Sequence, residues 1–195
     1  LGPLTNLARF ARTHPALVGT IAGVTVMGGA FRAAGNVSAV AEANIHNDPE
    51  AADEFFSQEW PITVLPLDIT MRHTLTERGA QVLAALPGAL PPVLAAMLEV
   101  YFDAYEPVYG ERRCALHDPL AAIVCADAAV VAVERRVPGV GVCTQGEERG
   151  RTLARDAPVR AAAPAVRIVE EITASADDLL LAVIREHDWP ERAEA

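Results

Sequence analysis

The sequence predicts an α/β fold in which helices flank an open, mostly parallel β-sheet. Short apolar, β-branched segments alternate along the chain with segments of helical character. Two of them, IAGVTVM (21–27) and ITVLPL (62–67), lack polar alternation, which is typical of strands buried on both faces of a parallel sheet. The 195 residues, 51% of them hydrophobic, suffice for one sizeable core, so we expect a single domain over 1–195.

Proline and acidic residues mark the boundaries of the expected elements in the first two thirds of the chain. Gly2-Pro3 is a good helix start, because proline at the first helical position loses no hydrogen bond. His14 precedes Pro15 and therefore ends this helix. The elements that follow are, in order, a strand over 21–27, a loop to about residue 47, a helix from Asp48-Pro49-Glu50 through 51–58, a strand over 62–67, a helix from Thr76-Glu77, a longer helix over 90–109 and a helix from His117.

The last third of the chain is expected to complete the sheet and close with a helix. AVVAVE (129–134) and AVRIVEE (165–171) have the composition of strands, and VGVCTQGEERGRT (140–152) suggests strands around a turn. Ser175 with Asp178 three residues later predicts a capping-box-like start for the closing helix SADDLLLAVIREH.

Charge and cysteine content exclude several classes of partner. A net charge of −10 argues against a nucleic acid or an anionic membrane, because either would require a basic surface. No apolar run is long enough to span a bilayer, and the start of the chain does not resemble a signal peptide. Cys114, Cys125 and Cys143 are odd in number and lack CxxC spacing, which favours neither a disulfide framework nor a zinc site. A reducing cytoplasm is the simplest location.

Polar groups follow the expected strands where an open α/β sheet binds its ligand, beyond the carboxyl ends of the strands. The loop after Met27 carries Asn36, Glu42 and Asn44, two amides and one carboxylate that can bind the vicinal hydroxyls of a sugar. Asp68 follows another strand. A sugar or polyol ligand is therefore the first hypothesis.

A second polar pair stands at a helix start, where His117 precedes Asp118. It combines a proton donor with a useful pKa and a hard oxygen ligand for a metal ion. The plainer alternative is that Asp118 caps the helix while His117 packs against a neighbour.

Plainer interpretations also exist for the other candidates. Asn36, Glu42 and Asn44 suit a solvated loop whose asparagines tolerate turn geometry, and Asp68 suits a turn or a cap. Tyr101, Tyr105 and Tyr109 are spaced i, i+4, i+8 on one helix face, a pattern more typical of a core than of an active site.

Five segments in order resemble the inosine-uridine preferring nucleoside hydrolases. They are LGPLTNLA (1–8), VMGGAF (26–31), GNVSAVAEANIHNDPEAA (35–52), PLDIT (66–70) and CALHDPLA (114–121). The resemblance implies the Rossmann-like nucleoside hydrolase fold with its N-terminal part missing. It also implies hydrolysis of the N-glycosidic bond of ribonucleosides such as inosine or uridine to free base and ribose, assisted by Ca²⁺, in a homo-oligomer (dimer or tetramer).

The resemblance assigns expected roles residue by residue. Asn36, Glu42 and Asn44 resemble the ribose-binding residues, and Met27 lines the sugar site. His117 resembles the acid that protonates the leaving base. Asp118 resembles a calcium-binding aspartate, and the main-chain carbonyl of Leu1 falls where the family offers another oxygen to the metal.

Two departures from the family pattern bear on activity. Ala43 replaces the phenylalanine of the usual Glu-Phe-Asn, which removes a ring near the sugar. The family's N-terminal DxDxxxDD cluster, which supplies calcium carboxylates and the base that activates water, occurs nowhere in the chain. We therefore expect the C-terminal portion of a hydrolase, inactive alone, whose activity belongs to the complete polypeptide. The alternatives are a non-catalytic ribonucleoside- or ribose-binding protein and an inactive truncated product.

Overall fold

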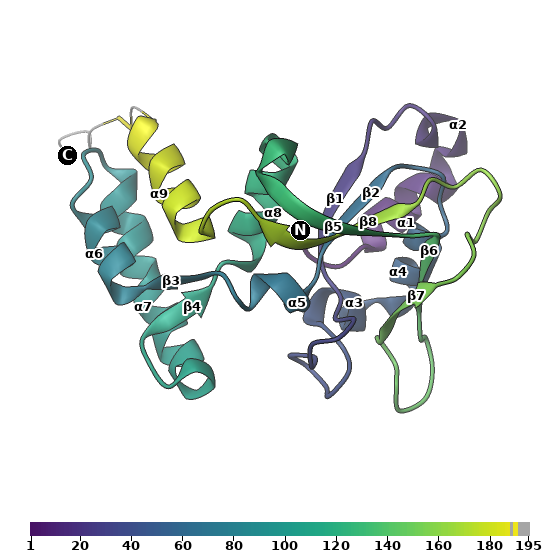
Figure 1. Ribbon diagram of the computed structural model, residues 1–195, viewed down its shortest axis with the longest axis horizontal. Coiled ribbons are helices and arrows are strands. Elements are labelled where there is room, and N and C mark those ends of the chain that lie inside the picture. Colours follow the sequence, from purple (N-terminus) through teal and green to yellow (C-terminus); the bar gives the residue numbers. More distant parts are fainter. Residues whose placement is uncertain (188, 191–195) are drawn as a thin grey trace.

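The computed structural model describes residues 1–187, 189 and 190 (Figure 1). Its helices are α1 (Thr5–Thr13), α2 (Pro15–Val18), α3 (Ala43–Asn47), α4 (Pro49–Phe56), α5 (Leu67–Thr70), α6 (Glu77–Ala84), α7 (Leu90–Tyr109), α8 (His117–Ala126) and α9 (Ala176–Glu186), with a 3₁₀ turn at Ala128–Val130. Its strands are β1 (Val24–Met27), β2 (Ile62–Leu65), β3 (Thr74–Thr76), β4 (Arg113–Ala115), β5 (Val131–Val137), β6 (Gly139–Val142), β7 (Thr152–Arg155) and β8 (Val166–Ile172).

The central sheet has four strands in the order β1-β2-β8-β5. The pairs β1–β2 and β2–β8 are parallel, and only β5, beside β8, is antiparallel. Two antiparallel pairs, β3–β4 and β6–β7, lie outside this sheet. The predicted α/β class with a mostly parallel sheet is confirmed.

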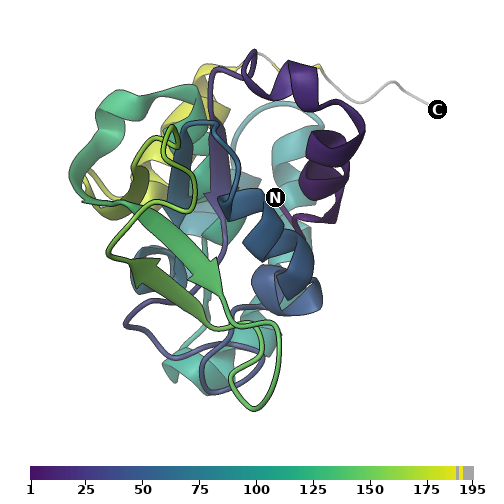
Figure 2. The same ribbon diagram turned by 90° about the vertical axis from the view of Figure 1, so that its right-hand side faces the viewer.

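Successive residues of the inner strands enter two different cores, as the alternation of side chains across a pleated strand requires. Val26 and Val64 pack with α1 and α4, which lie side by side in Figure 2. Met27 and Leu65 pack on the opposite side with residues of α8. Burial on both faces explains why the strand sequences lack polar alternation.

Helices α6, α7 and α9 form a group at one end of the molecule, together with the short pair β3–β4, while the hairpin β6–β7 lies at the other end (Figure 1). A small core of Leu83, Ala95 and Ile184 joins the three helices. Helix α7 spans the predicted range and ends at Gly110, whose left-handed φ of 71° suits the residue after a helix. This arrangement leaves the carboxyl end of β1 facing the helix group.

Several predicted boundaries were wrong. The loop to residue 47 contains α3, because the Glu42 side chain accepts hydrogen bonds from the first N–H groups of that helix. The first strand begins at Val24 rather than at residue 21. The second ends at Leu65, since α5 starts two residues later. Strand β5 begins at Val131 because a 3₁₀ turn precedes it.

Short elements and one cap also differ from prediction. Helix α2 and strands β3 and β4 have only three or four residues each and were not predicted. Ser175 does precede α9, but its hydroxyl donates to the Asp177 carboxylate and caps no backbone N–H. The capping-box-like start was therefore wrong, although the closing helix itself is confirmed.

Candidate functional site

A cavity of about 460 Å³ lies between the loop that follows β1 and the group of α6, α7 and α9. Its polar end is formed by the loop residues and by the start of α8. Its apolar end is lined by side chains of α6, α7 and α9, namely Leu83, Leu94, Met97, Leu98, Leu180 and Ile184. The position at the carboxyl end of β1 is where an open α/β sheet binds small molecules.

The cavity brings together most of the residues that the sequence singled out. Its lining includes Met27, Asn36, Glu42, Asn44, His117 and Asp118, although up to 91 positions separate them in the chain. Leu1 is not among the lining residues, and 69% of it is exposed. Asp68, the other strand-end acid, also lies outside the lining.

Glu42 is a buried residue, 2% exposed, rather than part of a solvated turn. Its Oε2 accepts hydrogen bonds from the backbone N–H of Gly29 (3.0 Å) and Ile45 (3.1 Å). Its Oε1 accepts one from Asn44 (2.8 Å). Three backbone donors thus compensate the carboxylate without a lysine or arginine. A carboxylate has about four acceptor sites, so one remains on Oε1.

Each of the two asparagine side chains is fixed by hydrogen bonds through one end of its amide group. Asn36 Oδ1 accepts from the Ala43 N–H at 2.9 Å. Asn44 Nδ2 donates to the carbonyl of Met27 at 3.1 Å and approaches its sulfur at 3.4 Å. Among the residues that the structure describes, the Asn36 amino group and the Asn44 carbonyl oxygen have no hydrogen-bond partner. The polar end therefore presents fixed donors and fixed acceptors together.

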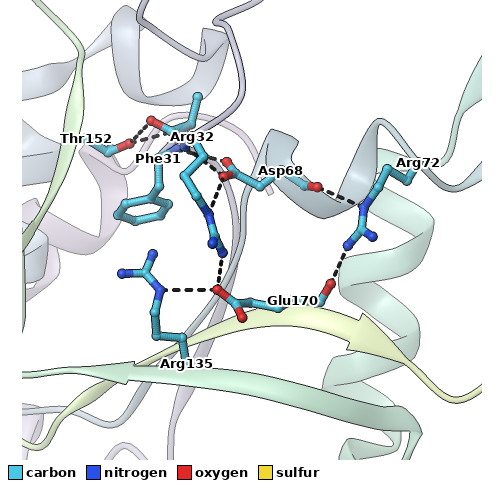
Figure 3. Close-up of polar contacts among 8 residues, drawn as sticks. Phe31, Arg32, Asp68, Arg72, Arg135, Thr152 and Glu170 are labelled. Carbon is cyan, nitrogen blue, oxygen red and sulfur yellow. Dashed lines mark hydrogen bonds and ion pairs between the residues drawn. The ribbon is translucent and has the colours of Figure 1, made fainter.

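Asp68 holds the backbone of the cavity loop (Figure 3). Its carboxylate accepts from the N–H groups of Phe31 (2.9 Å) and Arg32 (2.8 Å), just after β1. The Arg32 guanidinium also pairs with Glu170 of β8, which in turn pairs with Arg135 of β5. The plainer interpretation of Asp68, as a turn or cap residue, is close to what the structure shows, because the side chain fixes a loop.

Gly29 has to be glycine for two reasons. Its φ is +86°, a backbone conformation that residues with a side chain rarely adopt. A Cβ there would also lie 3.1 Å from the Thr152 side chain, whose hydroxyl bonds both backbone groups of Ala30. Strand β7 can therefore approach this turn closely only because Gly29 has no side chain.

His117 lies at the junction of the polar and apolar ends, 73 positions after Asn44. Its Nε2 is 2.9 Å from the Tyr105 hydroxyl, and its Nδ1 is 2.8 Å from the Thr70 hydroxyl. Burial lowers the pKa of His117, and the neighbouring Asp118 carboxylate partly opposes this effect. Burial raises the pKa of Tyr105. Both shifts favour the uncharged form of the group.

Asp118 is exposed and stands in the first turn of α8. It does not cap that helix, because the N-cap residue is Leu116 and no side chain caps it. The alternative that Asp118 is a capping residue was therefore wrong.

The described residues do not complete a metal site. Nowhere in residues 1–187, 189 and 190 do three or more His, Cys, Asp or Glu side chains gather as metal ligands. Glu42, the carboxylate that lines the cavity together with Asp118, already accepts three backbone hydrogen bonds. Since Ca²⁺ takes about six to eight oxygen ligands, these residues alone do not fit a resident calcium ion.

Sequence reasoning missed or undervalued three residues around the cavity. Tyr101 and Tyr105 line it, and Tyr101 is 55% exposed, so assigning the tyrosine stripe to the core was wrong for this residue. Thr70, fully buried, was not singled out beyond its place in the PLDIT segment. The i, i+4 spacing of the tyrosines was the available indication, but only the fold shows which side faces the cavity.

The fold and the cavity define a Rossmann-like α/β protein with a small-molecule site that is polar at one end and apolar at the other. The model of the inosine-uridine preferring nucleoside hydrolase family matches residues 1–176. The chain therefore belongs to this family, as the sequence motifs predicted. Among the residues described, no helix combines the length and hydrophobicity needed to cross a membrane.

Relatives and solved structures agree with this assignment. The chain is 35% identical over 154 residues to a probable uridine nucleosidase 2 from Arabidopsis thaliana, covering 78% of this chain and 47% of that protein. It is 35% identical over 148 residues to the inosine-uridine preferring nucleoside hydrolase of Crithidia fasciculata, covering 69% and 42%. A purine-preferring ribonucleoside hydrolase from Gardnerella vaginalis superimposes with a TM-score of 0.82 at 30% identity, covering 94% and 60%. The chain spans less than half the length of these two curated relatives.

Proposed function

We propose that this chain is the ribose-binding and base-protonating part of a hydrolase that cleaves the N-glycosidic bond of ribonucleosides to free base and ribose. The activity belongs to a complete polypeptide longer than these 195 residues. The observation that carries the proposal is the cavity itself, in which the Asn36–Asn44 loop faces His117 and Tyr105. The family membership and the names of the relatives support the reaction class.

The polar end has the groups that a ribose requires. The Asn36 amino group can donate to a ribose oxygen, while Asn44 Oδ1 and the remaining acceptor site of Glu42 Oε1 can accept from its hydroxyls. Backbone contacts hold all three side chains before any ligand arrives, so binding costs little side-chain entropy. Ala43, where the family usually has phenylalanine, leaves the sugar without a ring contact on this side.

The junction of the two ends has the groups that a departing base requires. Cleavage leaves the electron pair of the C1′–N bond on the base, which becomes a good leaving group once it takes up a proton, while water adds to the oxocarbenium-like sugar. The hydrogen-bonded pair of His117 Nε2 and the Tyr105 hydroxyl can supply that proton inside the cavity. The neighbouring apolar side chains can pack against the base.

Calcium binding is proposed as a property of the complete polypeptide. Asp118 can supply one oxygen ligand, and the Leu1 carbonyl is the second ligand that the family resemblance assigns to this chain. The remaining carboxylates, and the base that activates water, would come from outside these 195 residues, where we place the DxDxxxDD cluster. We also propose that the complete protein is a cytoplasmic homo-oligomer, a dimer or tetramer.

The test is ribose release by two forms of the protein. The complete polypeptide should release reducing sugar from inosine or uridine when calcium is present, and the 195-residue chain should not. Background release by the complete polypeptide would overturn the proposal. Calorimetry on the 195-residue chain tests the alternative of a non-catalytic binding protein. Ribonucleoside binding without calcium, together with no hydrolysis by either form, would identify such a protein.

A further inference from the structure

The PLDIT segment contains Thr70, a buried residue that the proposed reaction does not itself require. Thr70 is the last residue of α5 and is 0% exposed. Its hydroxyl oxygen lies 2.8 Å from Nδ1 of His117, which is 47 positions away. This contact approaches the ring from the side opposite to Tyr105, so the imidazole is held at both nitrogens.

The direction of this hydrogen bond follows from what the Thr70 hydroxyl can do with its proton. Among the described residues, the His117 ring is the only hydrogen-bond partner of that hydroxyl. If Nδ1 carried the ring proton and donated it, the hydroxyl proton would be buried without an acceptor, which costs about 1 to 3 kcal/mol. If the hydroxyl donates to Nδ1, no proton is left unpaired. The second arrangement is therefore the more stable one.

We propose that Thr70 is a positioning residue that donates its hydroxyl proton to Nδ1 of His117 and thereby places the ring proton on Nε2, toward Tyr105. In this tautomer Nε2–H donates to the Tyr105 oxygen, and the Tyr105 hydroxyl proton is free to point into the cavity. The tautomer is inferred from these contacts alone. Its importance for protonating a leaving base rests on the proposed function.

His14 provides a contrast within the same chain. Its Nδ1 lies 2.7 Å from the Thr13 hydroxyl, so the local contact is of the same type. The Thr13 hydroxyl, however, donates to the carbonyl of Arg9 at 2.9 Å. It can then only accept from His14, which favours a proton on Nδ1 of that ring.

The experiment is ¹⁵N NMR of the imidazole rings in the 195-residue chain at a pH of about 8, above the ordinary histidine pKa of about 6.5. The five histidines are assigned by single His→Gln variants. We expect His117 to be in the Nε2–H form and to show a smaller Nδ1–H fraction than His14. An Nδ1–H form of His117, or the same tautomer ratio in both rings, would overturn the proposal, and neither result depends on hydrolytic activity.

Two variants test the cause. Thr70→Val keeps the shape of the side chain but removes the hydroxyl, so the Nε2–H to Nδ1–H ratio of His117 should fall about tenfold, the equivalent of about 1.4 kcal/mol. Thr70→Ser restores the hydroxyl and should restore the ratio. A Thr70→Val protein that unfolds cooperatively yet keeps the wild-type tautomer would refute the proposal. If Thr70→Val does not fold, the wild-type and Thr70→Ser spectra still decide it.

Discussion

Replacing Glu42 by glutamine tests whether its carboxylate is the internal anchor of the cavity loop. The substitution keeps the size of the side chain and therefore opens no cavity. It replaces one of two acceptor oxygens by an amino group, at a site where three backbone N–H groups converge within 3.1 Å. At least one of these donors loses its partner.

The expected loss of stability follows from these three bonds. The amide can rotate so that its nitrogen takes the place of Oε1, which leaves only the Asn44 N–H unpaired. One unpaired buried donor costs about 1 to 3 kcal/mol, and each of the two remaining bonds loses about 1 kcal/mol of charge assistance. The free energy of unfolding should therefore fall by about 3 to 5 kcal/mol, a large part of the total stability of an ordinary domain.

Urea unfolding of the 195-residue chain, followed by circular dichroism, measures this change from the midpoint and the slope. Glu59→Gln is the matched control, because Glu59 is exposed and outside the cavity lining. It should change the free energy of unfolding by less than about 0.5 kcal/mol. A Glu42→Gln protein as stable as the control variant would refute the role assigned to this carboxylate.

Three further predictions concern the turn, the loop and the histidine. Gly29→Ala should lower the thermal midpoint more than Gly146→Ala, since both glycines have positive φ but only Gly29 faces a neighbouring side chain; the reverse order would contradict this account. Asp68→Ala should speed amide hydrogen exchange at residues 31 and 32, which its carboxylate binds, and unchanged exchange would remove its anchoring role. Burial lowers the pKa of His117 in the folded chain, whereas its pKa in the unfolded chain is about 6.5. As the pH drops, the unfolded chain therefore binds the proton first, and the free energy of unfolding should fall below a pH of about 6.5. His117→Asn should show a smaller loss in urea titrations over that range, and an equal loss would show that other groups cause it.

The sequence predicted the class of fold and six of the residues that line the cavity. The alternation of apolar strands and helices was sufficient for the class, because burial on both faces of the sheet makes the strand sequences largely apolar. The motifs placed Asn36, Glu42 and Asn44 with His117, and the cavity lining contains all four. Leu1 and Asp68 are candidates that the structure leaves outside the lining.

What the sequence could not show depends on contacts between distant residues. The compensation of Glu42 comes partly from Gly29, thirteen residues earlier, at a turn whose backbone only the folded chain defines. Thr70 meets His117 across 47 positions, and no local pattern marks such a pair. The exposure of Tyr101 follows from how α7 faces the cavity, which helical spacing alone leaves undetermined.

The ribose-binding role of the loop is tested most directly by Asn36→Ala in the complete polypeptide, assayed as kcat/KM for inosine with calcium present. The matched variant is Asn47→Ala in the same region. The Asn47 side chain donates to the Ala43 carbonyl and lies outside the cavity lining. Loss of one hydrogen bond to the ribose should lower kcat/KM about tenfold in Asn36→Ala, while Asn47→Ala stays within about twofold of wild type. A folded Asn36→Ala protein with the kcat/KM of Asn47→Ala would contradict the placement of the ribose at this end of the cavity.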